Sequence, residues 1–335
     1  MIKEAIIELS NKKDLTPETV EAVMDEIMNG QTSQVQTAAY LTSLSMKGET
    51  IDEIVASAKG MRKHAAQLHS SKELLEIVGT GGDCSNSFNI STTSSIVLAA
   101  AGIPVAKHGN RAASSKSGAA DVLEKLGVNI RIDPEKNEKV LEEVGICFLF
   151  AQTYHSAMKY VGPVRKELAI RTVFNILGPL TNPANATMQV MGVYSSDLVE
   201  PMAKVLSKLG VKKGMVVYGE DGLDEISASD KTLVCEINNG EFSSYELDPR
   251  DYGFELCGKS DLVGGTPEEN AQITRDILGG KKDAKRTAVV LNVAAGLHVA
   301  KGIDFASAVK EAEETIDSGK ALAKLEQFIA ATNAY

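Results

Sequence analysis

From residue 74 onward the chain alternates short apolar runs of strand length with segments of helical periodicity, and no other feature restricts its fold as strongly. The alternation predicts a mainly parallel sheet with helices on both faces. Ligands bind such sheets at the carboxyl ends of the strands, so a site is expected in the loops that follow them. The strand-like runs lie at residues 74–78, 103–107, 128–132, 146–150, 189–194 and 214–219, and helical segments lie at 117–126, 134–144 and 198–209.

The first 70 residues differ, because they contain helical patterns and no strand-like run. Thr16 followed by Pro17 is a typical helix start, with threonine as the N-cap and proline at the first helical position. Another helix is expected to begin near Thr32, and one more to run from residue 50 or 51 to about residue 69. A length of 335 residues suits about two domains.

We therefore expect an α/β protein with a small all-helical domain at residues 1–70 and a larger α/β domain at residues 74–335. Near the C-terminus, residues 232–237 and 242–247 predict two antiparallel strands, because the Asn-Asn-Gly sequence between them favours a hairpin turn. From residue 266 to the end the pattern is helical.

The charge balance limits the classes of partner. The formal net charge is -10 and the isoelectric point about 5.2, which disfavours long-range attraction to nucleic acid or to an anionic membrane. The chain has no signal-peptide pattern and no apolar run of ~18 residues, and its cysteines form no CxxC pair or zinc-ligand spacing. We expect a cytoplasmic protein that binds neither nucleic acid nor membrane.

The segment VGTGGD, residues 78–83, directly follows a predicted strand, and residues 88–93 (FNISTT) open an apolar helix. Glycines let backbone N–H groups approach an anion, and a helix N-terminus capped by Ser91 or Thr92 adds positive potential. Together they predict a phosphate cradle, although a plain tight turn has the same local pattern. The sequence matches neither GxGxxG nor a Walker A motif, so a nucleotide site of those types is not supported.

The densest basic and hydroxyl-rich stretch, residues 106–118 (AKHGNRAASSKSG), follows the next strand. Lys and Arg supply charge for an anion, while hydroxyl and loop N–H groups supply directed donors. A solvated loop is the alternative. Two anion-suited loops at successive strand ends favour a phosphate-binding site over that alternative.

The segment YGEDGLDEI, residues 218–226, follows a further strand and carries several carboxylates. It lacks the length and spacing of an EF-hand loop. Adjacent Asp and Glu residues after a strand suit Mg²⁺ that is held partly through water and phosphate oxygens. A charged surface turn is the alternative, and the two phosphate-suited loops favour the metal site.

Residues 154–165 (YHSAMKYVGPVR) have the pattern of a helix that carries His155 and Arg165. Such a surface suits an aromatic carboxylate, with Arg165 as the partner of the anion. On these residues alone, a contact between helix and domain with a hydrogen-bonded histidine is the preferred interpretation. The stretch at residues 174–183 (FNILGPLTNP) predicts only a turn-rich bend.

Together, the motifs VGTGGD, FNIST, KHGNRAASSKSGAADVLEKLG, HSAMKYVGPVRKELAIRT, FNILGPLTNP and DGLDE resemble those of the anthranilate phosphoribosyltransferase family, which has the nucleoside phosphorylase/phosphoribosyltransferase fold. They follow the family's order from Gly79 to Glu225. The resemblance implies transfer of the 5-phosphoribosyl group from phosphoribosyl pyrophosphate to the amine of anthranilate, in tryptophan biosynthesis, with Mg²⁺ as cofactor. It also implies a hinge between the domains, helices at about 155–185 packing on the helical domain, and a homodimer formed through the helical domains.

The resemblance also implies roles for individual residues. Anthranilate would contact Gly79, Asn110, His155 and Arg165, and Mg²⁺ would be held by Ser91, Asp224 and Glu225. Phosphoribosyl pyrophosphate would be bound by Gly79, Gly82, Asp83, Ser87, Asn89, Ile90, Ser91, Thr92, Lys107, His108, Gly109, Asn110, Arg111, Ala112, Ala113, Ser114, Ser115 and Ala119.

Two positions depart from the family pattern: Cys84 stands where the family usually has Gly, and Ala119 where it often has a Ser that touches the sugar phosphate. Displacement of pyrophosphate at the anomeric carbon needs no protein nucleophile, and no convincing Ser/His/Asp or Cys/His set is present. One alternative is a pyrimidine nucleoside phosphorylase of the same fold, which KHGNR and DGLDE disfavour. A non-catalytic nucleic-acid-binding relative is the other, and the negative charge disfavours it.

Overall fold

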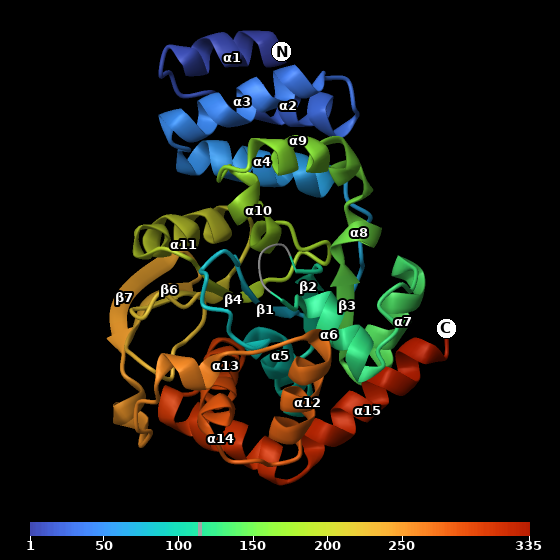
Figure 1. Ribbon diagram of the computed structural model, residues 1–335, viewed down its shortest axis with the longest axis vertical. Coiled ribbons are helices and arrows are strands. Elements are labelled where there is room, and N and C mark those ends of the chain that lie inside the picture. The colour runs from blue at the N-terminus through green and yellow to red at the C-terminus, as the bar shows by residue number, and fades with distance from the viewer. Residues whose placement is uncertain (113–115) are drawn as a thin grey trace.

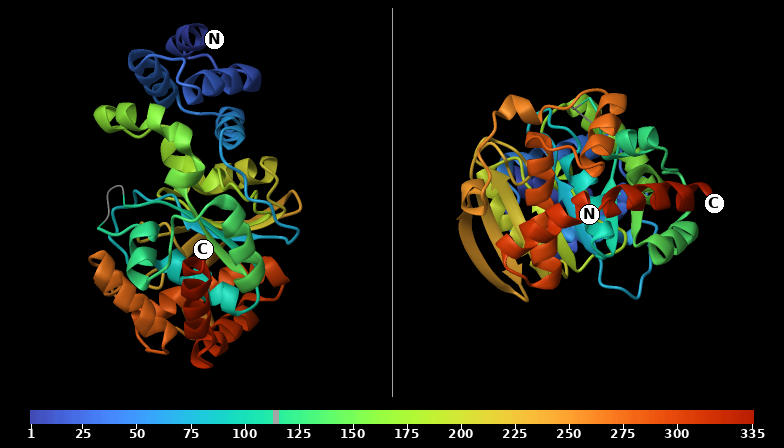
Figure 2. Two further views of the ribbon diagram at one scale, coloured as in Figure 1. Left: turned by 90° about the vertical axis from the view of Figure 1, so that its right-hand side faces the viewer. Right: turned by 90° about the horizontal axis from the view of Figure 1, so that it is seen from below.

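The computed structural model describes residues 1–112 and 116–335. Within residues 1–63 the chain forms a bundle of α1 (Ile2–Ser10), α2 (Pro17–Met28), α3 (Gln34–Lys47) and α4 (Ile51–Lys63), which stands at one end of the molecule (Figures 1 and 2). The predicted cap at Thr16 is confirmed, since its side chain accepts a hydrogen bond from the Thr19 amide. Ser33 and Thr50 each form a capping box at the start of the next two helices.

Helix α4 ends at Lys63 rather than near residue 69 as predicted. The side-chain amide of Gln67 donates hydrogen bonds to the carbonyl oxygens of Arg62 (3.0 Å) and Ala65 (3.1 Å). These bonds satisfy carbonyl groups that a continuing helix would have used. The chain then leaves the bundle toward the first strand.

In the described part of the chain, a seven-stranded sheet has the order β3-β2-β1-β4-β5-β6-β7. The pairings from β3 through β5 are parallel, and β6 and β7 add antiparallel strands at one edge. Asn239 and Gly240 both have positive φ (50° and 90°), which confirms the predicted hairpin turn. The strands are β1 (Leu75–Gly79), β2 (Val105–Gly109), β3 (Ile146–Phe150), β4 (Met188–Gly192), β5 (Lys213–Gly219), β6 (Thr232–Asn238) and β7 (Glu241–Leu247).

Helices cover both faces of this sheet, as the alternation predicted (Figure 1). One face packs against α5 (Ile90–Ala100) and α13 (Ala284–Lys301), with α12 (Pro267–Leu278), α14 (Phe305–Asp317) and α15 (Lys320–Asn333) around them. The other face packs against α11 (Val199–Lys208), and its buried side chains form one apolar cluster with those of the helical bundle. The expected α/β architecture with a helical N-terminal domain is therefore confirmed.

The chain returns to the helical bundle after β3, through α8 (Ala151–Tyr154), the 3-10 helix η1 (Ser156–Tyr160) and α9 (Gly162–Leu168). Helix α9 contacts α3, and η1 contacts α2, before α10 (Phe174–Leu180) leads back to the sheet. The single helix predicted at residues 154–165 is wrong, because the chain breaks at His155 and again at Val161. The predicted bend at residues 174–183 contains the short helix α10, with Pro179 in its last turn.

The strand predicted at residues 128–132 is also wrong, since this segment is irregular. It connects α6 (Ala119–Leu126), which ends at the left-handed Gly127, to α7 (Pro134–Val144). Val128, Ile130 and Ile132 are buried in the main core, so their apolar character reflects packing rather than pairing. The place beside β2 in the sheet is taken by β3.

Helix α5 begins two or three residues earlier than expected, with Asn89 rather than Ser91 or Thr92 at the N-cap. Among the described residues, no single helix combines the length and apolarity needed to cross a bilayer. Within the described ranges, one pair of helices, α13 with α14, meets both conditions jointly, and it is bent by 117° at its break.

Candidate active site

The loops after β1 and β5 meet at the carboxyl edge of the sheet, where they flank the end of β4. A Cβ atom on Gly79, the last residue of β1, would overlap the Asp224 carboxylate. A Cβ atom on Gly192, at the end of β4, would overlap the Asp224 carbonyl oxygen. Glycine at these two strand ends therefore lets the acidic loop lie directly on the sheet edge.

Asp224 and Glu225 are buried, and each binds the backbone of a neighbouring loop. The Gly81 amide donates to Asp224 Oδ2 at 2.6 Å, and the Ser91 amide donates to Glu225 Oε1 at 3.1 Å. Burial raises the pKa of Asp224 well above its usual value, and the carboxylates of Asp83 and Glu225 raise it further. Burial likewise raises the pKa of Glu225 to about 7, against the opposing effect of Lys107.

Buried, mutually repelling carboxylates are stabilised in their ionised form by a nearby cation. The donors available here are the oxygens of Asp83, Asp224, Glu225 and Ser91, and a hard divalent cation prefers oxygen ligands. The described residues contain no ready-made cluster of three or more His, Cys, Asp or Glu side chains that could hold a metal ion. The site thus suits a cation that takes one or two carboxylates and completes its coordination with ligand oxygens.

The glycine loop after β1 turns sharply at Gly81 and Gly82, whose φ angles are 71° and 76°. Asp83 faces the acidic loop, since its carboxylate accepts a long hydrogen bond (3.4 Å) from the Asp224 amide. Cys84 is exposed and has a φ of 59°, a left-handed conformation that glycine adopts more easily. The departure from the family pattern at residue 84 therefore falls on a position whose backbone favours glycine.

Asn89, at the start of α5, joins the first loop to the second. Its side-chain amide donates to the Ser117 carbonyl oxygen (3.1 Å), and its Oδ1 accepts from Ser117 Oγ (3.2 Å) and from Asn270 on α12 (2.9 Å). Ile90 and Thr92 are buried in the first turn of α5, so only their backbone groups are available to a ligand. The two loops predicted to bind phosphate are thus tied together.

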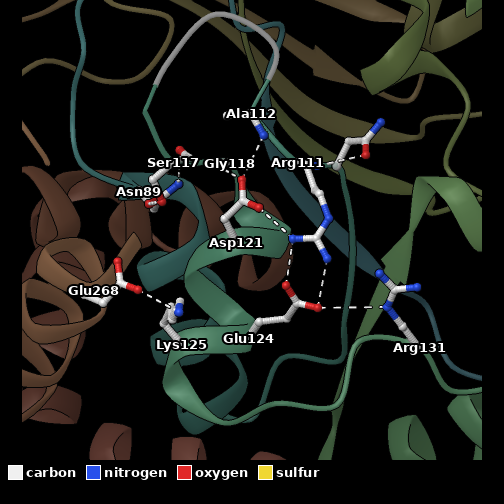
Figure 3. A network of polar contacts seen from close by, with 11 residues as sticks. Asn89, Arg111, Ala112, Ser117, Gly118, Asp121, Glu124, Lys125, Arg131 and Glu268 are labelled. Atoms are coloured by element: carbon white, nitrogen blue, oxygen red, sulfur yellow. Dashed lines mark hydrogen bonds and ion pairs between the residues drawn. The ribbon is translucent and has the colours of Figure 1, made fainter. Parts of the chain in front are cut away.

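The basic loop after β2 is closed at its base by Asp121 on α6 (Figure 3). One oxygen, Asp121 Oδ2, accepts hydrogen bonds from the amides of Ala112 and Gly118, both at 2.9 Å. A Cβ atom on Gly118 would overlap the backbone of Ala112, so this closure requires glycine. The predicted ligand residues Ala113, Ser114 and Ser115 lie outside the described residues, and Ala119 begins α6 directly after the closure.

Arg111, a predicted ligand of the sugar pyrophosphate, is engaged within the protein. Its guanidinium forms ion pairs with Asp121 (2.7 Å) and Glu124 (2.6 Å), which raise its pKa (Figure 3). Asn110 accepts a hydrogen bond from the Arg111 amide. In this arrangement Arg111 holds the loop in shape instead of presenting a free positive charge.

Lys107 and His108 lie in β2 below the loops and are buried. Lys107 Nζ donates to the Ile77 carbonyl oxygen on β1 at 2.8 Å. Burial lowers the pKa of Lys107, while Glu76, Glu225 and Asp224 act to raise it. Its positive charge therefore compensates the buried carboxylate of Glu76 on β1 and those of Asp224 and Glu225 in the acidic loop.

His108 and His155 face each other, with ring centroids 5.0 Å apart. Burial lowers the pKa of His108 to about 3 and that of His155 to about 4, so both are neutral at pH 7. The ring nitrogens of His155 lack a well-placed hydrogen-bond partner in the described part of the chain. Arg165 lies 5.4 Å from the Phe174 ring, and burial lowers its pKa. None of the carboxylates in the described ranges pairs with Arg165, which leaves it available to an anion.

Sequence reasoning missed several residues that shape this site. Gly192 was readable as a glycine inside a strand pattern, which often marks close backbone approach. Asp121 was readable as an acidic residue three positions after a glycine at a helix start. No local signal marks the contacts of Glu76, Asn270 and Arg171 with His108, Asn89 and Gly82, which are distant in the sequence.

Comparison with known proteins agrees with this geometry. Residues 3–65 match the family described as "Glycosyl transferase family, helical bundle domain", and residues 71–322 match "Glycosyl transferase family, a/b domain". The fold and the site thus define a glycosyl transferase built from a helical bundle and an α/β domain.

The relatives narrow this class. The chain is 63% identical to the anthranilate phosphoribosyltransferase of Methanobrevibacter smithii (99% of this chain, 100% of the relative). It is 60% identical to that of Lachnoclostridium phytofermentans, over 99% of both chains. The crystal structure of the Thermus thermophilus enzyme superposes with a TM-score of 0.93 at 43% identity, covering 98% of this chain and 99% of the other. The Saccharomyces cerevisiae enzyme "in complex with PRPP and Mg" superposes with a TM-score of 0.92 at 28% identity, covering 100% and 98%. The chain belongs to the anthranilate phosphoribosyltransferase family.

Proposed function

We propose that this protein transfers the 5-phosphoribosyl group from phosphoribosyl pyrophosphate to the amine of anthranilate, a step of tryptophan biosynthesis. One observation carries the proposal: the buried acidic pair Asp224–Glu225 contacts the glycine loop at Gly81 and the start of α5 at Ser91. An anionic ligand and a divalent cation would therefore share one sheet edge.

Phosphoribosyl pyrophosphate would lie between the loop after β1 and the loop after β2. Backbone amides at Gly79 and Gly82 and the start of α5 would face its phosphates, as a helix N-terminus favours anions. Mg²⁺ fits the oxygen donors of Ser91, Asp224 and Glu225, and a structure of the yeast relative is described with both PRPP and Mg. Bound there, Mg²⁺ neutralises the pyrophosphate and makes it a better leaving group.

Anthranilate would occupy the region that Gly79, Asn110, His155 and Arg165 border, with its carboxylate toward Arg165. A neutral His155 suits this role, because it adds no charge beside an aromatic ring. A structure of the yeast relative is described "in complex with 4-fluoroanthranilate", an analogue of this substrate.

The chemistry would proceed without a covalent intermediate on the protein. An aromatic amine is already a free base at pH 7, so a strong general base is not required. Residues of this chain would position the amine against the anomeric carbon, stabilise an oxocarbenium-like transition state, and exclude water.

We also propose that the protein is a cytoplasmic homodimer that associates through its helical domains, with the division at residues 1–70 and 74–335. Three large apolar side chains on α1 and α3 support the dimer, because Ile7, Val35 and Met46 are 62%, 78% and 82% exposed. Light scattering on the intact protein and on a Val35→Lys, Met46→Lys variant tests this surface; a wild-type monomer would refute it.

The function is tested by mixing purified protein, anthranilate, phosphoribosyl pyrophosphate and Mg²⁺ and following anthranilate fluorescence. Loss of fluorescence only when all components are present supports the proposal. No change with a folded protein rejects it, and phosphate-dependent cleavage of a pyrimidine nucleoside would then identify the phosphorylase alternative.

A further inference from the structure

Strands β1 and β2 pair at their beginnings and then separate. Leu75 opposite Val105 is the single residue pair in register between them, whereas β1 and β4 stay in register over five pairs from Leu75 to Gly79. The ladder between them does not continue toward the carboxyl ends, where the two phosphate-suited loops begin. An interrupted ladder leaves backbone groups that need other partners.

Side chains supply these partners. The Glu76 carboxylate accepts a hydrogen bond from the His108 amide (3.1 Å), and Lys107 Nζ donates to the Ile77 carbonyl oxygen (2.8 Å). Asn182 Nδ2 donates to the Ala106 carbonyl oxygen at 2.8 Å. Glu76 on β1 thus binds the backbone of β2, and Lys107 on β2 binds the backbone of β1.

The two crossing side chains also balance each other's charge. Glu76 is fully buried and Lys107 is 2% exposed. Burial raises the pKa of Glu76 to about 7, and Lys107 acts to lower it. A buried charge that loses an opposite charge nearby becomes less favourable, so removing either charge would destabilise the other.

We propose that Glu76 is a positioning residue of the phosphoribosyl pyrophosphate site. It acts through the His108 backbone and the Lys107 ammonium to fix the spacing between the loops after β1 and β2. The inference rests on the proposed function, because that function places the sugar pyrophosphate between these loops. Glu76 itself reaches neither loop in the hydrogen bonds that it makes.

The test compares Glu76→Gln with Glu76→Asp. Glutamine keeps an acceptor for the His108 amide but removes the charge that balances Lys107, whereas aspartate keeps the charge. We expect Glu76→Gln to raise KM for phosphoribosyl pyrophosphate by about tenfold, with kcat and KM for anthranilate little changed. Glu76→Asp should recover most of this loss.

Arg286→Met is the matched control, because Arg286 is another buried charge (5% exposed) that pairs with Glu313 and Asp317 away from the site. It should lower the melting temperature without changing either KM. If Glu76→Gln behaves in the same way, Glu76 is merely structural and the inference is wrong.

Calorimetric titration with inorganic pyrophosphate and Mg²⁺ measures the same site without turnover. Weaker pyrophosphate binding by Glu76→Gln, with Glu76→Asp close to wild type, supports the inference even if the wild type proves inactive with anthranilate. Should Glu76→Gln fail to fold, unchanged pyrophosphate affinity in Lys107→Met would overturn it. Failure of the proposed function would instead appear as absent wild-type turnover.

Discussion

The guanidinium of Arg171 donates a hydrogen bond of 2.9 Å to the carbonyl oxygen of Gly82 and lies 3.9 Å from the centre of the Tyr194 ring. The carbonyl oxygen of Arg171 in turn accepts a hydrogen bond (3.0 Å) from Ser45 Oγ on α3. One residue between α9 and α10 therefore contacts the glycine loop, the segment after β4 and the helical domain.

Replacing Arg171 with Met should loosen the glycine loop and raise KM for phosphoribosyl pyrophosphate by about tenfold. Ser45→Ala removes only the contact with the helical domain and should have a smaller effect. Steady-state kinetics on both variants checks this. If both variants keep the wild-type KM for phosphoribosyl pyrophosphate, the Gly82 contact has no influence on substrate binding.

Gly192→Ala should destabilise the protein by more than about 3 kcal/mol, because the added methyl overlaps the Asp224 carbonyl oxygen and backbone must move. Gly162→Ala is a suitable control, since a Cβ atom there meets no heavy atom within 4 Å. Urea unfolding of both variants measures the difference. A Gly192→Ala protein as stable as the control would contradict the close approach.

The two carboxylates of the acidic loop should be needed for turnover. Replacing Asp224 with Asn and Glu225 with Gln together is expected to lower kcat/KM at limiting Mg²⁺ at least about 100-fold, because the oxygen ligands lose their charge. Glu220→Gln in the same loop, an exposed residue, serves as control. Near wild-type turnover by the double variant would contradict the proposal that Asp224 and Glu225 hold Mg²⁺.

Acid should destabilise the protein through His108 and His155. Their pKa values in the folded state, about 3 and about 4, lie below the ordinary value of about 6.5 that applies to the unfolded chain. Their contribution to the free energy of unfolding is therefore complete above pH 6.5. It is lost as the pH falls, by roughly 2 kcal/mol for each histidine at pH 5. Urea unfolding at pH 7 and pH 5 measures this effect. Between the two pH values, the free energy of unfolding should fall less for His155→Gln than for the wild type.

His298 provides the opposite control. Its hydrogen bond to Glu236 raises its pKa, so its contribution is present below pH 6.5 and is lost as the pH rises through the folded-state value. His298→Gln should make the acid-induced loss larger, not smaller. If His155→Gln and His298→Gln move the pH dependence in the same direction, this assignment of signs is wrong.

Asp121→Asn should open the base of the loop after β2. Asparagine keeps the size of the side chain but loses the ion pair with Arg111 and weakens acceptance from the Ala112 and Gly118 amides, a loss on the order of 1–2 kcal/mol. Hydrogen exchange at those two amides should become faster. Glu124→Gln removes the outer ion pair of Arg111 and the 4.0 Å pair with Arg131 but touches neither amide, so it should leave their exchange slow.

The sequence predicted most of the fold because its signals are local. The alternation of runs, the cap at Thr16 and the Asn-Gly turn at Asn239 each depend on neighbouring residues, and each is confirmed. Residues 128–132 misled the prediction because burial in a loop gives the same apolar pattern as burial in a strand. The region of residues 155–180 misled it because tertiary contacts with α2, α3 and α4 decide where its short helices begin and end.

The candidate site was predictable where the residue types of a motif indicate what it binds, as at VGTGGD for phosphate and DGLDE for Mg²⁺. It was not predictable where function depends on a distant partner. Arg111 has the composition of a phosphate ligand, yet Asp121 and Glu124 engage it. Glu76 belongs to no motif, and its hydrogen bond to the His108 amide, 32 residues away, has no local signal in the sequence.

The path of the chain between its two domains has a mechanical consequence. It leaves the helical bundle after α4, returns to it through α8 and η1, and leaves it again through α10 (Figure 1). A single proteolytic cut at residues 64–74 would therefore free α1–α4 covalently, and only packing against η1, α9, α10 and α11 would hold them to the rest of the protein. The helical end of the molecule is thus built from two separate stretches of sequence, so α1–α4 complete their packing only after η1 and α9, about 100 residues further along the chain, have returned to them.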